Sequence, residues 1–149
     1  MDIQDKLRAH LRTASRVTAS VLASLLLYLA GVEYIRARFG PFSGFLAVSD
    51  PKLLRYAFFA LAIATVIAIR ALRPRLLRKV AGDDDKTALH RIQRAFLMTI
   101  VLAEVPGTLG LLLFLMAGLN IDFYFLLFAS LLLVFMYFPR RSAWEEWLS

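Results

Sequence analysis

The chain has 149 residues, of which 60% are hydrophobic, with a mean hydropathy of +0.65 and a formal net charge of +7. This composition is too apolar for a soluble domain of this length and predicts an integral membrane protein. The chain contains no cysteine, which excludes disulfides and thiolate metal sites.

Four apolar segments are long enough, or nearly so, to cross a hydrocarbon core about 30 Å thick. They lie near residues 17–35, 56–72, 95–118 and 123–138, and the fourth is the shortest. We therefore expect an all-α fold in which residues 1–149 form a single transmembrane domain, a four-helix bundle with up-down topology. The first apolar run is longer than the core of a signal peptide, so we expect a retained anchor rather than a cleaved leader.

Amphipathic segments flank the predicted bundle at both ends. Residues 1–16 place Ile3, Leu7 and Leu11 at helical spacing among charged residues. Near the other end, Ser142 and Glu145 fit a capping box, and the two tryptophans that follow Ser142 would share one helix face. We expect a short interfacial helix at each terminus.

The basic residues predict the orientation of the chain. With the four segments above, both termini and the loop between the second and third segments share one side of the membrane. That side carries Lys6, Arg8, Arg12, Arg16, Arg70, Arg73, Arg75, Arg78, Lys79, Lys86, Arg91, Arg94, Arg140 and Arg141, whereas the other side carries Arg36, Arg38, Lys52 and Arg55. Positive charge accumulates on the cytoplasmic side, which predicts a multi-pass protein of the cell inner (plasma) membrane with both termini in the cytoplasm.

The positive net charge raises the question of a nucleic-acid partner. The sequence carries no nucleic-acid-binding motif, and basic residues beside apolar segments typically set topology and contact anionic lipid headgroups. We therefore expect the lipid bilayer and its anionic headgroups as partners, and no nucleic acid. Other membrane proteins or further copies of the chain are possible partners.

Glu104 is the most informative residue because it lies near the middle of the apolar segment 95–118. A charged side chain at the centre of a spanning helix costs about 2.5–3.5 kcal/mol, whereas each Leu, Ile, Phe or Val returns about 0.3–0.6 kcal/mol. The segment still inserts, but its carboxyl group needs an explanation. Ionisable residues at this depth usually belong to a functional site.

Three groups are expected around the Glu104 carboxyl. Thr108 lies one helical turn further on. Pro106 has no N–H to donate, which would free the carbonyl of Leu102. Thr65, midway along the second segment, would face the site from another helix. These oxygens together predict a proton or cation site, or alternatively a purely structural hydrogen bond between helices.

Three further features bear on helix packing and connections. Ala60, Ala64 and Ala68 place a stripe of small residues on one helix face, which suits helix packing within the bundle or at a subunit interface. The connection 36–54 contains glycine, proline and three phenylalanines, so we expect it to enter the interface or to cap the bundle. Residues 120–122 are expected to form a tight turn between the last two helices.

The segment 103–112, AEVPGTLGLL, resembles the ion-carrying helix of rotary ATPase proteolipids (subunit c). Helices of that family place a carboxylate in the middle of the membrane, followed by a proline or small residue and then by a glycine within an aliphatic run. The resemblance implies that Glu104 is an ion-binding carboxylate. This chain differs from the family in lacking a glycine-rich stripe on its second segment and in having further predicted spans around the matched hairpin.

The sequence carries no pattern typical of an enzyme active site, cofactor site or metal cluster. The leading hypothesis is a small inner-membrane protein with a protonatable or cation-binding carboxylate, acting in transport or as an accessory subunit of an ion-translocating complex. The alternative is a structural or assembly subunit without transport activity, in which Glu104 only links helices.

Overall fold

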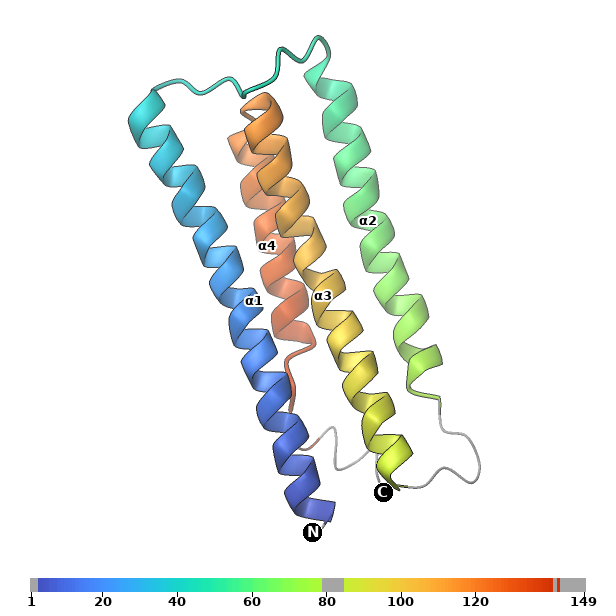
Figure 1. Ribbon diagram of the computed structural model, residues 1–149. Coiled ribbons are helices and arrows are strands. Elements are labelled where there is room, and N and C mark those ends of the chain that lie inside the picture. Colours follow the sequence, from blue (N-terminus) through green and yellow to red (C-terminus); the bar gives the residue numbers. More distant parts are fainter. Residues whose placement is uncertain (1–2, 79–84, 141, 143–149) are drawn as a thin grey trace.

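A computed structural model describes residues 3–78, 85–140 and 142, and all regular structure in these residues is helical. The helices are α1 (Ile3–Phe39), α2 (Pro51–Leu76), α3 (Asp85–Ala117) and α4 (Asn120–Met136). They lie side by side, and each runs in the direction opposite to the preceding one (Figure 1). The start of α1 and the end of α4 therefore point to one end of the bundle, the terminal end, and the α3–α4 turn lies at the other, the turn end.

Three of the helices are long and apolar enough to cross a membrane. The qualifying stretches are Leu7–Phe39, Pro51–Leu76 and Lys86–Ala117. Helix α4 has 17 residues, which corresponds to about 25 Å at 1.5 Å per residue. The outer surface is also apolar, since many large hydrophobic side chains are exposed, among them Leu27, Ile63, Ile67 and Phe125. These features are those of a helical membrane protein.

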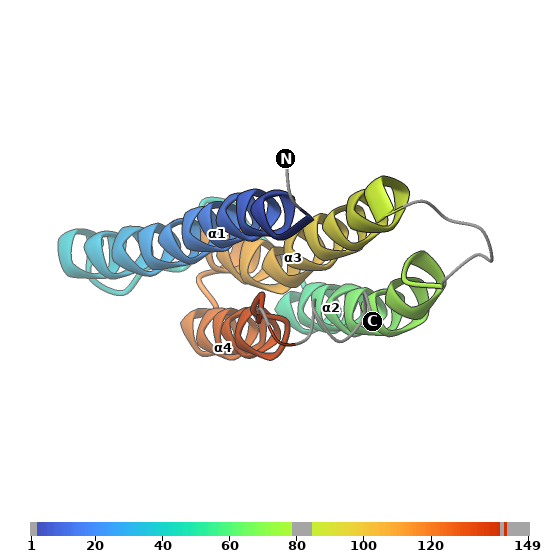
Figure 2. The same ribbon diagram turned by 90° about the horizontal axis from the view of Figure 1, so that it is seen from below.

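Helix α3 is the centre of the bundle. It packs against each of the other three helices, and the view along the bundle shows it between α1 and α2 with α4 alongside (Figure 2). Its residues Ile100, Ala103 and Leu113 are completely buried. By contrast, α2 buries only Ala62 and Ile69. Helix α2 is thus the least embedded of the four.

The segment 1–16 does not form a helix separate from the first predicted span. Helix α1 continues without interruption from Ile3 to Phe39, so residues 3–16 are its first turns. Leu7 and Ala14 of these turns are buried within the structure. The predicted interfacial helix near the other terminus involves residues 143–149, which lie outside the described residues.

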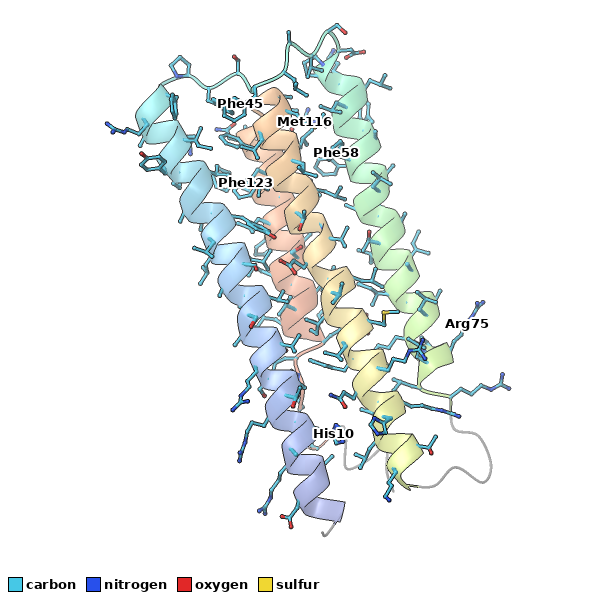
Figure 3. All side chains as sticks on the ribbon, viewed as in Figure 1. His10, Phe45, Phe58, Arg75, Met116 and Phe123 are labelled. Atoms are coloured by element: carbon cyan, nitrogen blue, oxygen red, sulfur yellow. The ribbon has the colours of Figure 1, made fainter. Side chains whose placement is uncertain are left out.

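The connection between α1 and α2 caps the end of α3, as expected from its glycines and phenylalanines. The backbone N–H groups of Phe45 and Leu46 donate to the carbonyl oxygens of Leu115 and Met116 at 2.8 and 3.2 Å. Phe45 and Met116 accordingly lie together at the turn end, opposite His10 and Arg75 (Figure 3). The last carbonyls of a helix have no partner within the helix, and this loop supplies one.

The turn between α3 and α4 was predicted at residues 120–122, and this position is wrong. Helix α4 already begins at Asn120, so the turn consists of Gly118 and Leu119. Gly118 has φ +68 and donates its N–H to the carbonyl of Phe114 at 2.7 Å. A glycine in the left-handed region commonly ends a helix in this way, and it stops α3 before the polar residues are reached.

The loop cap can be tested with substitutions of two glycines that both have positive φ but differ in their surroundings. Gly40 and Gly44 both have positive φ, but a Cβ at Gly40 would meet open space whereas one at Gly44 would lie 2.2 Å from the Met116 carbonyl oxygen. We expect Gly40→Ala to lower the free energy of unfolding by about 1–2 kcal/mol and Gly44→Ala to lower it distinctly more. Thermal unfolding in mild detergent measures both; equal losses would contradict the close contact between loop and helix.

Candidate functional site

The Glu104 carboxyl is bound from a neighbouring helix. The hydroxyl of Tyr28, on α1, donates to Oε1 of Glu104 at 3.0 Å. Both side chains are partly buried at the contact between α1 and α3. Tyr28 lies within the first predicted span, so the bond joins two helices at a depth where a polar group finds little water.

A second interhelical bond lies one turn along α3, at Gly107. Ser130 of α4 is completely buried, and its Oγ accepts the N–H of Gly107 at 2.6 Å. The same hydroxyl donates to the backbone carbonyl of Glu104 at 3.4 Å. Pro106 disturbs the hydrogen-bond ladder at this turn because it lacks an N–H and crowds the preceding turn. Ser130 thus supplies a partner where the helix ladder is weakened, and α3 remains one continuous helix through Pro106.

The groups that the sequence placed around Glu104 are only partly brought together. Thr108 donates to the backbone carbonyl of Glu104 at 3.4 Å, not to its carboxyl. Thr65 donates to the carbonyl of Leu61 in its own helix at 2.9 Å. Within the described residues, no side chain from another helix donates to the carbonyl of Leu102. The partners that the structure gives to this turn are instead Tyr28 and Ser130.

This arrangement suits a hydrogen-bonded carboxyl better than a coordinated cation. Hard cations such as Ca²⁺ take about six to eight oxygen ligands, and Mg²⁺ requires oxygen ligands in octahedral geometry. In the described part of the chain, the Glu104 carboxyl has a single side-chain partner, the Tyr28 hydroxyl. The same residues contain no group of three or more His, Asp or Glu side chains placed to hold a metal ion.

The turn end carries an ion pair that the sequence analysis did not anticipate. Arg55 of α2 donates from Nε to both carboxylate oxygens of Asp122, at 2.8 and 2.9 Å, and its Nη2 lies 2.8 Å from Oδ1. Asp122 is 3% exposed and lies in the first turn of α4, where the helix dipole also stabilises a negative charge. This bond ties the loosely embedded α2 to α4.

A second charged cluster at the turn end joins α1 to α4. Glu33 and Arg36, three residues apart on α1, form an ion pair with Arg36 Nη1 3.1 Å from Glu33 Oε1. Tyr124 of α4 completes it, since its hydroxyl accepts from Arg36 Nη1 at 2.6 Å and donates to Glu33. The exposed pair alone would stabilise little, but its contact with Tyr124 links two helices.

The two histidines of the chain meet at the terminal end. The rings of His10 on α1 and His90 on α3 pack edge to face with centroids 5.7 Å apart. Both residues lie outside the spans predicted near residues 17–35 and 95–118. Two imidazoles are fewer ligands than a structural metal site normally requires, so the contact is best described as helix packing.

Comparisons of this chain with protein-family models, with curated proteins and with solved structures found no match. The resemblance of segment 103–112 to rotary ATPase proteolipids therefore remains a prediction that rests on the local motif.

The role of Ser130 can be tested against a serine in a different setting. Ser130→Ala leaves the buried N–H of Gly107 without its partner, which should lower the free energy of unfolding by about 1–3 kcal/mol. Ser20 is exposed and donates only to the carbonyl of Arg16 in its own helix, so we expect Ser20→Ala to change stability by less than about 0.5 kcal/mol. Unfolding in detergent, followed by circular dichroism, distinguishes the two; a neutral Ser130→Ala would show that the α3–α4 bond is dispensable.

Proposed function

We propose that this chain is a small multi-pass protein of the inner membrane that acts as a structural or assembly subunit, with Glu104 fastening α3 to α1. The observation that carries the proposal is the bond from the Tyr28 hydroxyl to the Glu104 carboxyl at 3.0 Å. A carboxyl that is neutral and hydrogen-bonded across helices is much less costly in the membrane than a free charge. This role requires no ion and no catalytic step.

In this proposal all four helices cross the membrane in an up-down bundle. The 18 lysines and arginines are divided unequally between the two ends of the proposed bundle, and most of them belong to the terminal end. Positive charge accumulates on the cytoplasmic side, which favours a terminal end in the cytoplasm. Helix α4 has only 17 residues, which is short for a helix that crosses the membrane. Its packing against α3 and the Arg55–Asp122 ion pair hold it in place. Short helices are accommodated by local thinning of the bilayer and by flanking anchors.

Helix α2 offers the surface that a partner subunit would use. Ala57, Ala60, Ala64 and Ala71 are exposed on it rather than packed inside the bundle. Small residues let two helix backbones approach closely, and van der Waals packing then stabilises the contact. The partner in this proposal is a transmembrane helix of another membrane protein or of a second copy of this chain.

The second candidate function is proton transfer through Glu104, alone or within an ion-translocating complex. It is favoured by one observation, the partial exposure of the Glu104 side chain at the α1–α3 contact. A carboxyl that is not sealed and holds one hydrogen bond can exchange its proton more easily than a fully enclosed one. Intramembrane carboxyls commonly serve as proton relays.

Two substitutions of Glu104 separate these functions. Gln keeps an acceptor for the Tyr28 hydroxyl but cannot carry a titratable proton, whereas Leu removes the acceptor. For a structural subunit we expect Glu104→Gln to keep the thermal midpoint and the co-purifying partners, and Glu104→Leu to lower stability by about 0.6–1.7 kcal/mol. Thermal unfolding and affinity purification in mild detergent measure both properties.

Proton flux into proteoliposomes is the decisive second measurement. If proton flux is present in the native chain and lost in Glu104→Gln while stability is unchanged, the structural function is wrong and proton transfer is the function of Glu104. If Glu104→Leu changes neither stability nor partner association, the structural function is wrong.

The cysteine-free sequence makes the topology directly testable. We expect a single cysteine introduced at Ser142 to react with a membrane-impermeant maleimide only when the cytoplasmic face is open. A cysteine at Ser49, in the loop at the turn end, should react from the opposite face, and both wild-type residues are exposed. Labelling of both positions from the same side would contradict the proposed arrangement.

A further inference from the structure

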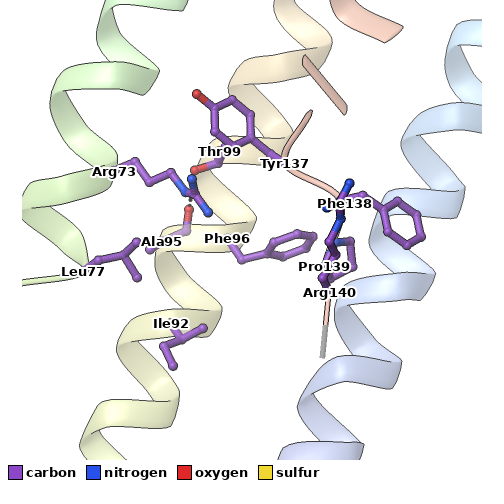
Figure 4. A pocket seen from close by; sticks show the side chains of 10 residues that line it. All are labelled: Arg73, Leu77, Ile92, Ala95, Phe96, Thr99, Tyr137, Phe138, Pro139 and Arg140. Carbon is purple, nitrogen blue, oxygen red and sulfur yellow. Dashed lines mark hydrogen bonds between the residues drawn. The ribbon is translucent and has the colours of Figure 1, made fainter. Parts of the chain in front are cut away.

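A pocket at the terminal end lies between α2, α3 and the segment after α4 (Figure 4). Its volume is about 80 Å³, roughly two to three times the space that a water molecule takes in the liquid. Phe96, Leu77 and Phe138 contribute apolar walls, and Arg73 and Arg140 contribute positive charge. The pocket is therefore a small cationic recess in an apolar surface.

Arg73 is held in place by the ring of Tyr137. Its guanidinium carbon lies 4.7 Å from the ring centroid, a cation–π contact that links α2 to the residue following α4. A guanidinium stacked on a ring keeps the N–H groups at its edge available for an acceptor. Within the described residues neither Arg73 nor Arg140 forms an ion pair with a carboxylate, since the salt bridges found there are those of Arg36 and Arg55.

The hydroxyl of Thr99, which also lines the pocket, is not available to bind a ligand. Thr99 is buried and donates its hydroxyl proton to the carbonyl of Ala95 at 2.7 Å. The donors left for a ligand are the Tyr137 hydroxyl and the two arginines, and the positive charge of the arginines selects an anion. Guanidinium groups bind phosphate oxygens particularly well because their planar donors match the geometry of the group.

We infer that this pocket binds the phosphate of an anionic phospholipid, whose acyl chains lie along the exposed apolar surface of the neighbouring helices. The two arginines that line the pocket suit a phosphate rather than an acyl chain. Basic pockets between membrane helices on the cytoplasmic side are a recurrent setting for anionic headgroups. The inference uses the membrane location and orientation proposed above but does not depend on any role of Glu104.

The test is a thermal-shift titration of the purified full chain in mild detergent. The added ligands are phosphatidylglycerol, phosphatidylcholine with the same acyl chains, and inorganic phosphate. We expect saturable stabilisation by phosphatidylglycerol and none by the other two at equal concentration. Each arginine near an anionic surface contributes about fivefold in affinity, so Arg140→Gln should weaken binding about fivefold and the double variant with Arg73→Gln about 25-fold.

The matched control removes the same charge at the same end of the bundle. Arg75 on α2 and Arg94 on α3 are exposed and do not line the pocket, so Arg75→Gln combined with Arg94→Gln should change the affinity by less than about twofold if the pocket is the site. Equal weakening by the two double variants would show diffuse attraction and overturn the inference. Stabilisation by inorganic phosphate to the same extent would identify a soluble anion as the ligand instead. Arg140 is exposed, so its single variant gives a reading even if the change at Arg73 impairs folding.

Discussion

The need to satisfy polar groups away from water governs this bundle. A backbone or side-chain polar group without a hydrogen-bond partner costs roughly several kcal/mol in the hydrocarbon core. Such a group therefore needs a partner inside the protein. Helix α3 meets this requirement through its neighbours. Its Glu104 carboxyl is bound from α1 by Tyr28, and its Gly107 N–H is bound from α4 by Ser130. Its carbonyls near the turn end accept from the connection between α1 and α2. Each of these bonds also fixes the position of another element against α3.

The same bonds explain why the four helices are not equally embedded. Helices α1, α3 and α4 are joined by polar contacts both in the middle of the bundle and at the turn end. Helix α2 has few buried residues, and its described side-chain bonds to the other helices are the Arg55–Asp122 pair and the Arg73–Tyr137 contact near its two ends. Its middle presents small side chains outward beside large ones, among them Ile63 and Ile67. That division suits a chain with a stable three-helix core and one helix that can also receive a partner.

Hydropathy and the residues of the connections predicted where the long helices lie, because a spanning helix requires a long apolar run and a polar connection. They did not predict that α1 begins at Ile3 or that α4 begins at Asn120. They also identified Glu104, since a lone carboxyl in such a run is visible without any structure. They did not identify its partners. Thr65 and Thr108 were chosen from depth and from sequence distance, but contacts across helices depend on the rotation and register of each helix, which the apolar pattern leaves open. Tyr28 was visible as a hydroxyl within the first span, and Ser130 as one within the fourth.

The Arg55–Asp122 pair escaped prediction for a related reason. The turn was predicted at residues 120–122, which placed Asp122 in the connection. Gly118 instead ends α3 early and makes Asp122 part of the first turn of α4. Helix boundaries shift by a few residues with the local cap geometry. A shift of that size decides whether a carboxylate faces water or the neighbouring helix.

The most direct test of the account is a double-mutant cycle on the bond between α1 and α3. The free energy of unfolding is measured in mild detergent for the native chain, for Tyr28→Phe, for Glu104→Leu and for the double variant. If the Tyr28 hydroxyl and the Glu104 carboxyl stabilise each other across the two helices, the coupling energy should be about 0.6 kcal/mol and not above about 1.7 kcal/mol, the mean and the maximum of such couplings between membrane helices. A coupling energy close to zero would contradict the central claim that Glu104 fastens α3 to α1.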